Sequence, residues 1–170
     1  TNVRVHNWGC ASSVETIRFF EDFGNIGGSS SAPDMAAGNE LEVQVKPLDD
    51  LLEELGSVEL IKIDVEGMEC SALKGAEKVI SRFHPVICLE QHETAFTPDF
   101  TETESLDWLR SRGYRMFSLK RAKRKNLIVR RLANIRQLFF GIKEARDIVE
   151  YERLSRSTYP MIYAVHHSVL

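Results

Sequence analysis

Several features are scarce in this sequence of 170 residues, and each absence excludes a class of protein. Its three cysteines, Cys10, Cys70 and Cys88, are widely spaced and form no CxxC pair, which argues against a disulfide framework or a structural zinc site. No apolar run approaches membrane-spanning length, and residues 1–9 lack the apolar core of a signal peptide. Basic residues are not in excess, because the formal net charge is −3. Without a basic excess, a nucleic-acid partner is not expected. Without a long apolar run, stable membrane insertion is not expected either. For a protein with these cysteines, a reducing cytoplasm is the simplest setting.

Strand-like and helical patterns alternate along the chain, which at 43% hydrophobic residues can bury the core of a single domain. The strands are expected over 2–7, 13–20, 41–46, 60–65, 86–89, 114–119 and 160–166, and the helices over 48–55, 69–83, 103–112 and about 127–157. Residues 24–38, rich in Gly, Ser and Ala, are expected to form a loop. This alternation predicts an α/β fold with a largely parallel sheet, carrying a long helical insertion at about 127–157.

The segment from Leu60 to Glu69 carries charges where a central strand should be apolar. Lys62 and Asp64 lie on one face of this strand, and Asp64 falls at its carboxyl end, where open α/β sheets bind ligands. Glu66 and Glu69 follow this strand, in the turn and in the first turn of the expected helix. Three alternatives stay open: a structural Lys62–Asp64 ion pair, carboxylates that complement the helix N-terminus, and a hard-cation site, which no local His or Asn supports. No metal is expected.

A second polar group, Glu90-Gln-His-Glu93, follows the apolar run Val86–Leu89. It should lie beside the first group, because the carboxyl ends of neighbouring parallel strands meet at one edge. His92 has an intrinsic pKa suited to proton transfer; the alternative is a histidine in a solvent-exposed loop. The remaining histidines are expected to be ordinary strand-edge or loop residues: His6, His84, His166 and His167.

At these residues the chain resembles a known family. The series that carries the resemblance runs Pro47-Leu-Asp-Asp50, Leu60-Ile-Lys-Ile-Asp-Val-Glu-Gly67, Leu73-Lys-Gly-Ala76, Pro85-Val-Ile87 and Glu90. It is similar to the C-terminal half of FkbM-type methyltransferases, and Arg112-Gly-Tyr114 resembles that family's later Gly-Tyr. The resemblance covers roughly residues 2–119 and returns at the last strand.

The resemblance implies a class I methyltransferase fold, which is Rossmann-like with a mixed sheet. It also implies an S-adenosylmethionine-dependent O-methyltransferase that acts on a small-molecule hydroxyl, commonly of a sugar, a polyketide or another secondary metabolite. Asp64, ending the fourth strand, would lie beside the methyl donor. We therefore expect Asp64, His92 and Glu90 as catalytic residues, and Asp64 with Glu66 as cofactor-binding residues.

One departure from the family pattern bears on function. Such proteins begin with a strand and a Gly-rich loop that hold the donor, and no such pair precedes Asn2. We expect a fold that lacks the first two strands, a gap in the sheet between the third and fourth, and weak donor binding by this chain alone. An N-terminal segment or a second copy could complete the fold. The alternative function is a non-catalytic remnant or binding module that retains the methyltransferase fold.

Overall fold

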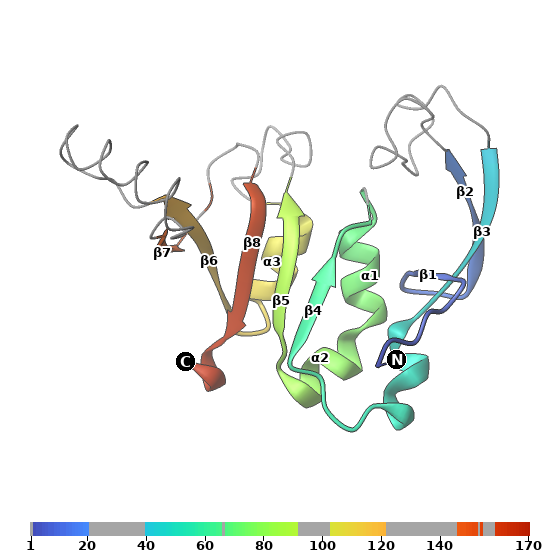
Figure 1. Ribbon diagram of the computed structural model, residues 1–170, viewed down its shortest axis with the longest axis horizontal. Helices are drawn as coiled ribbons and strands as arrows, with labels where there is room; N and C mark the ends of the chain where they lie inside the picture. The colour runs from blue at the N-terminus through green and yellow to red at the C-terminus, as the bar shows by residue number, and fades with distance from the viewer. Residues whose placement is uncertain are drawn as a thin grey trace, which may run out of the picture.

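The computed structural model describes residues 2–20, 40–65, 67–91, 103–121, 146–152, 154 and 159–170, which form a mixed α/β fold with two sheets (Figure 1). The strands are β1 (Gly9–Cys10), β2 (Glu15–Phe20), β3 (Glu40–Lys46), β4 (Leu60–Ile63), β5 (Val86–Gln91), β6 (Tyr114–Arg121), β7 (Arg146–Tyr151) and β8 (Tyr159–His166). The helices are α1 (Glu69–Gly75), α2 (Glu77–Phe83) and α3 (Glu104–Arg110), with the 3-10 turns η2 (Leu48–Glu54) and η4 (His167–Val169).

The larger sheet has five strands in the order β4-β5-β8-β6-β7. Its β4 and β5 are parallel, with Leu60 beside Val86 and Ile63 beside Leu89. The pairs β5–β8, β6–β8 and β6–β7 are antiparallel. The parallel β4–β5 pair with a helical crossover is confirmed. The expectation of a largely parallel sheet is wrong for the described strands, because β8 runs against both of its neighbours.

The smaller sheet has three strands in the order β1-β3-β2 and lies apart from the larger one (Figure 1). In it β2 and β3 form an antiparallel pair, and β1 runs parallel to β3. β3 and β4, which follow one another along the chain, thus lie in different sheets. The gap expected in the sheet stays a prediction. That two strands are missing from the fold stays a prediction.

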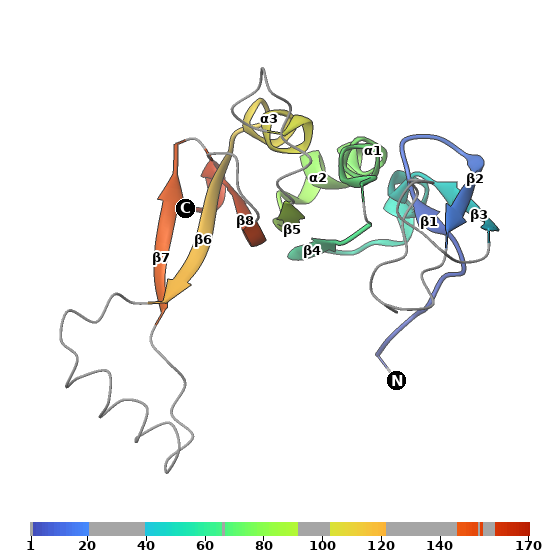
Figure 2. The same ribbon diagram turned by 90° about the horizontal axis from the view of Figure 1, so that it is seen from above.

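All three α-helices cover one face of the larger sheet (Figure 2). Period-two alternation sends every second side chain of the strands toward them. The core between the two layers contains Ile63, Leu73, Ile80, Ile87, Leu89, Leu106, Leu109, Met116 and Ile162, each at most 4% exposed. Among the described residues, no helix is long and apolar enough to cross a membrane.

The expected helix over 69–83 is present but divided at Ala76, whose φ of −110° and ψ of 14° separate α1 from α2. Gly75, the last residue of α1, packs directly against the backbone of Ala11 and Pro47. The missing side chain is what allows the segment after β1 to approach the helix so closely. Gly75 thereby joins the smaller sheet to the helix layer.

Two expected elements are wrong. Residues 2–7 form no strand, and Val3 and Val5 of this segment are 70% and 87% exposed. The helix expected at about 127–157 is wrong for Arg146–Tyr151, which forms β7 and pairs along β6 from Met116 to Arg121. Pairing with a neighbouring strand overrode the helical spacing of the apolar residues there. The loop expected over 24–38 lies outside the described residues.

Candidate functional site

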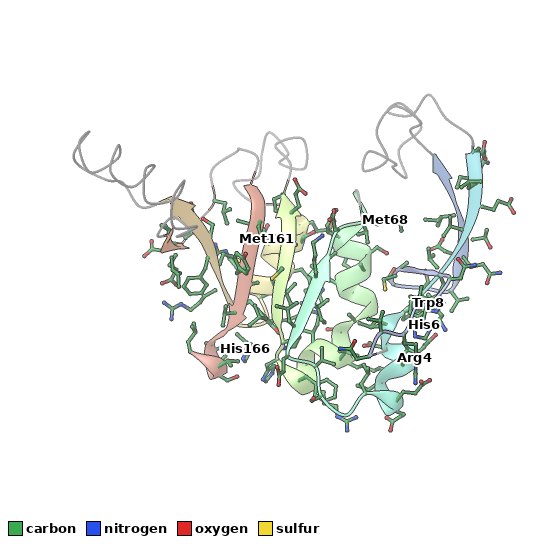
Figure 3. The ribbon with its side chains drawn as sticks, in the orientation of Figure 1. Arg4, His6, Trp8, Met68, Met161 and His166 are labelled. Atoms are coloured by element: carbon green, nitrogen blue, oxygen red, sulfur yellow. The ribbon has the colours of Figure 1, made fainter. Side chains whose placement is uncertain are left out.

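The candidate site lies where β4 and β5 end side by side. In their parallel register Lys62 is beside Cys88 and Ile63 is beside Leu89. Extending this register by one residue brings Asp64 level with Glu90. The edge concerned is the upper one in Figure 3, where Met68 stands just before α1. The sheet therefore brings together two carboxylates that are far apart in the sequence, as expected from the sequence.

Alternation along the two strands separates this polar group from the core. Ile63 and Leu89 are buried against the helices, at 4% and 0% exposed. Lys62 and Asp64 project from the opposite face, where their side chains are 53% and 43% exposed. Among the described strands, β4 has a neighbour on only one side. Its charged side chains stay in contact with water, which avoids the cost of burying them in a fully enclosed strand.

The electrostatics of the site centre on Lys62, whose ammonium forms a hydrogen-bonded ion pair with Asp64. That hydrogen bond is the main cause that raises the pKa of Lys62, followed by the charges of Asp64 and then of Glu90. The ammonium thus lies in the field of both carboxylates. The carboxylate oxygens at this edge can accept hydrogen bonds from a bound molecule.

The purely structural explanation of the Lys62–Asp64 pair is weak on physical grounds. Both side chains are about half exposed, and exposed ion pairs contribute little to stability because water screens them and the side chains lose freedom. A pair of this kind can exchange its partner for a ligand at small cost. The structural pair and the ligand contact therefore both stay open as explanations of this arrangement.

Glu69 has a local structural role instead. It stands in the first turn of α1, and its carboxylate accepts a hydrogen bond from the backbone N–H of Gly67 at 3.1 Å. Gly67 has a φ of 99°, a conformation that favours glycine. Glu69 thus stabilises the turn that leads into α1. This agrees with the alternative in which carboxylates after Asp64 serve the start of the helix.

Two other candidates, Glu66 and His92, lie outside the described residues, as does Glu93. Their roles stay predictions. In the ranges that the structure describes, no group of three or more His, Cys, Asp or Glu side chains could hold a metal ion. Cys88, the register partner of Lys62, is buried at 6% exposed. Cys88 is thus a packed core residue, and desolvation raises the pKa of its thiol.

A buried polar pair that the sequence reading missed supports the end of β5. Gln91 and Thr103 are 2% and 4% exposed, and the Thr103 hydroxyl donates a hydrogen bond to the Gln91 side-chain carbonyl. Thr103 also accepts from the backbone N–H of Leu106 at 3.4 Å, which caps α3. The available signal was a threonine directly before Glu104, a common helix start. This pair fixes the beginning of α3 against the strand that carries Glu90.

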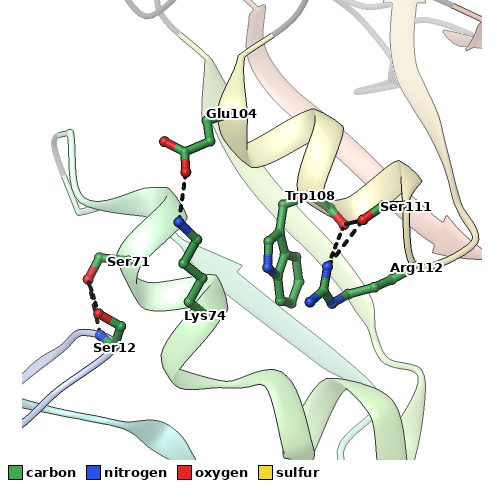
Figure 4. A network of polar contacts seen from close by, with 7 residues as sticks. All are labelled: Ser12, Ser71, Lys74, Glu104, Trp108, Ser111 and Arg112. Atoms are coloured by element: carbon green, nitrogen blue, oxygen red, sulfur yellow. Dashed lines mark hydrogen bonds and ion pairs between the residues drawn. The ribbon is translucent and has the colours of Figure 1, made fainter.

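The helix layer carries a second polar network, which joins elements to one another (Figure 4). Lys74 of α1 donates to Glu104 of α3 at 2.7 Å. The Ser71 hydroxyl accepts from the backbone N–H of Ser12 at 3.0 Å. The guanidinium of Arg112 lies 3.6 Å from the centre of the Trp108 ring. The first two contacts link separate segments of the fold, and the third lies within α3 and the turn that follows it. These contacts hold the helix layer together and call for no ligand.

Comparison with protein families gives one finding. The family model described as "Methyltransferase FkbM domain" matches residues 3–116, more than half of the chain. The match includes β1 to β5, α1 to α3 and the first residues of β6, and with them Lys62, Asp64 and Glu90. Comparisons with curated proteins and with solved structures gave no match.

Proposed function

The chain belongs to the FkbM methyltransferase family, and from that premise we propose that its protein is an S-adenosylmethionine-dependent O-methyltransferase. The acceptor in this proposal is a hydroxyl group of a sugar or a secondary metabolite. The observation that carries the proposal is the cluster of Lys62, Asp64 and Glu90 at the carboxyl ends of two parallel strands. In open α/β sheets this edge is where ligands bind.

The residues at this edge fit the proposed donor. S-adenosylmethionine supplies a methyl group on a positively charged sulfur, and transfer makes the acceptor O–CH3 bond as the S–CH3 bond breaks. A carboxylate such as that of Asp64 attracts a positively charged group. Carboxylate oxygens also accept hydrogen bonds from hydroxyl groups such as those of a ribose. We assign Asp64, together with Glu66, to contact with the donor.

The remaining work of the site is positioning and removal of a proton. Displacement at a methyl carbon requires the attacking oxygen to be held in line with the breaking bond, and fixing that geometry lowers the barrier. Lys62 acts as a positioning residue, because its ammonium holds the Asp64 carboxylate. Glu90 is placed to orient the acceptor. His92 is our candidate for the base that takes the hydroxyl proton, since an imidazole can accept a proton near neutral pH.

The test is Asp64→Asn in the complete protein, which keeps the shape of the side chain and removes its charge. S-adenosylhomocysteine release would be measured with a panel of hydroxylated sugars and secondary metabolites. Loss of one positioned charged group should lower methyl transfer by about tenfold or more while the fold survives. Asp50→Asn is the matched control, because Asp50 is an exposed aspartate of η2 outside the site.

Other outcomes would refute the proposal in different ways. Unchanged turnover in Asp64→Asn together with a lower melting temperature would make the Lys62–Asp64 pair structural. A complete protein that neither binds S-adenosylmethionine nor methylates any acceptor of the panel would be a non-catalytic remnant or a binding module. Equal losses in Asp64→Asn and Asp50→Asn would show a general effect of lost charge and remove Asp64 from the site.

A further inference from the structure

Three histidine rings that the proposed reaction does not use meet at the opposite end of the larger sheet. His84 follows α2, His166 ends β8, and His167 begins η4. The rings of His84 and His166 are stacked, with centroids 3.8 Å apart and planes at 12°. The centroids of His166 and His167 are 4.2 Å apart. We call these three residues the histidine cluster; Figure 3 shows His166 at the lower end of the sheet, away from Met68.

The hydrogen bonds of the cluster require His166 to be neutral. Its Nδ1 accepts from the backbone N–H of Ser168 at 3.3 Å and lies 2.7 Å from the Ser168 hydroxyl. The same hydroxyl lies 3.3 Å from Nδ1 of His84. A nitrogen that accepts a hydrogen bond carries no proton, whereas both nitrogens of a charged imidazole are donors. In a charged His166 the N–H at Nδ1 would face the backbone N–H of Ser168. The hydrogen bond between these two residues, which begins η4, would then be lost.

The cluster holds three turns of the chain together. The backbone N–H of His167 donates to the carbonyl of Gly113, in the turn between α3 and β6, at 3.0 Å. Gly113 has a φ of 83°, and a Cβ there would lie 2.5 Å from Nδ1 of His167 and 3.1 Å from Nε2 of His166. The rings of His166 and His167 thus pack closely against Gly113, where a side chain would not fit. His84 contributes from the end of α2, where it adopts a left-handed φ of 46°.

The surroundings of His166 disfavour a positive charge. The ring is 7% exposed. Burial is the main cause that lowers its pKa, followed by the charges of His84 and His167, while the backbone of Arg112 acts in the opposite direction. Tyr114 of β6 meets the ring edge-on, with centroids 5.2 Å apart.

The charged residue in the turn after α3, Arg112, is already paired. The Arg112 guanidinium donates to Glu77, so that carboxylate is occupied. In the described part of the chain, no carboxylate is among the groups that act on the His166 ring. Protonation of His166 therefore meets no compensating carboxylate among the described residues.

From this geometry we propose that the histidine cluster is an acid-sensitive contact, which we call the clasp: with His166 neutral it holds the C-terminal turn η4 to the turns after α2 and α3, and protonation of His166 releases η4. The direction follows from linkage. A histidine that binds its proton less readily in the folded state stabilises the fold above about pH 6.5, the ordinary imidazole value. This stability is lost as the pH falls below that value toward the folded-state pKa.

The clasp can be tested by amide hydrogen exchange measured by NMR at about pH 7.5 and about pH 5.5, on either side of the ordinary imidazole pKa. After correction for intrinsic rates, protection of the His167 amide should fall at the lower pH, by about tenfold at most, since one histidine whose ordinary pKa lies about one unit above pH 5.5 can shift the opening equilibrium by no more than that. The Ile162 amide, in the middle of β8, should keep its protection. Equal protection of His167 at both pH values would overturn the proposal.

Variants separate the clasp from general acid sensitivity. His84→Asn removes the ring that stacks on His166 and helps to lower the pKa of His166. It keeps a residue that tolerates the left-handed conformation, so the fall in His167 protection should be smaller. His6→Asn is the control, because His6 lies outside the cluster beside Trp8, and it should respond as the parent does. Should His84→Asn fail to fold, His167→Asn, which keeps the backbone N–H, takes its place. A variant of the cluster with the parent's full pH response would also overturn the proposal.

Discussion

Replacing Gly75 by alanine should destabilise the fold although alanine is the better helix former. Gly75 ends α1, and an added Cβ would fall on the carbonyl oxygen of Ala11. It would also lie 2.7 Å from the carbonyl carbon of Ala11 and 3.3 Å from Cα of Pro47. Carbon atoms in ordinary contact are about 3.5–4.0 Å apart. Since the obstacles are backbone atoms, no side-chain rotation can relieve the overlap.

The magnitude follows from two opposing effects. Alanine in place of glycine inside a helix is favourable by about 1 kcal/mol. Overpacking a well-packed site costs about 1–3 kcal/mol and occasionally more, and an obstacle made of backbone places this case at the upper end. We therefore expect Gly75→Ala to lower the free energy of unfolding by about 2 kcal/mol. In a protein of this size that corresponds to a melting temperature lower by about 4–8 °C.

Urea unfolding followed by circular dichroism measures this difference. Gly56→Ala is the matched control, because a Cβ at Gly56 meets no atom within 4 Å. That variant should be neutral or more stable by about 0.4–1 kcal/mol, since alanine restricts the unfolded chain. If Gly75→Ala unfolds at the same urea concentration as the parent or as Gly56→Ala, the close approach of Ala11 to α1 is wrong.

Two further predictions concern single groups. In the complete protein, methyl transfer should rise through roughly pH 6–7, near the ordinary imidazole pKa, and His92→Ala should flatten that rise and lower the plateau; an unchanged pH profile would remove His92 from the mechanism. The Tyr114 hydroxyl is buried and, among the described residues, has no hydrogen-bond partner, and burial raises the pKa of Tyr114 to about 12. Tyr114→Phe should therefore leave the free energy of unfolding unchanged or raise it by about 1 kcal/mol, whereas a loss of that size in urea unfolding would reveal a partner for the hydroxyl.

Part of the candidate site could be predicted because it follows from periodicity alone. Alternation along Leu60–Ile63 sets Lys62 on the face opposite Ile63, and a helix between two strands makes them parallel neighbours. These two rules are enough to bring Asp64 level with Glu90. The ion pair between Lys62 and Asp64 also follows, since side chains two residues apart in a strand lie on one face.

Other parts depended on partners that are distant in sequence. The alternating Val3 and Val5 suggested a strand, but no described strand pairs with this segment. Arg146–Tyr151 had apolar residues at a spacing that suits a helix, and β6 made it a strand. In both cases the local pattern allowed more than one structure, and backbone hydrogen bonds to another segment, or their absence, decided between them.

By itself the sequence determined the family, most of the strands and helices, and the edge of the sheet at which Lys62, Asp64 and Glu90 meet. Each of these rests on residues close in the chain or on spacing within one element. Only the tertiary structure decided that β8 enters between β5 and β6, that Gly75 receives the backbone of Ala11, and that His84 stacks on His166. Such contacts join segments far apart in the sequence, and their geometry is fixed only when the whole core packs.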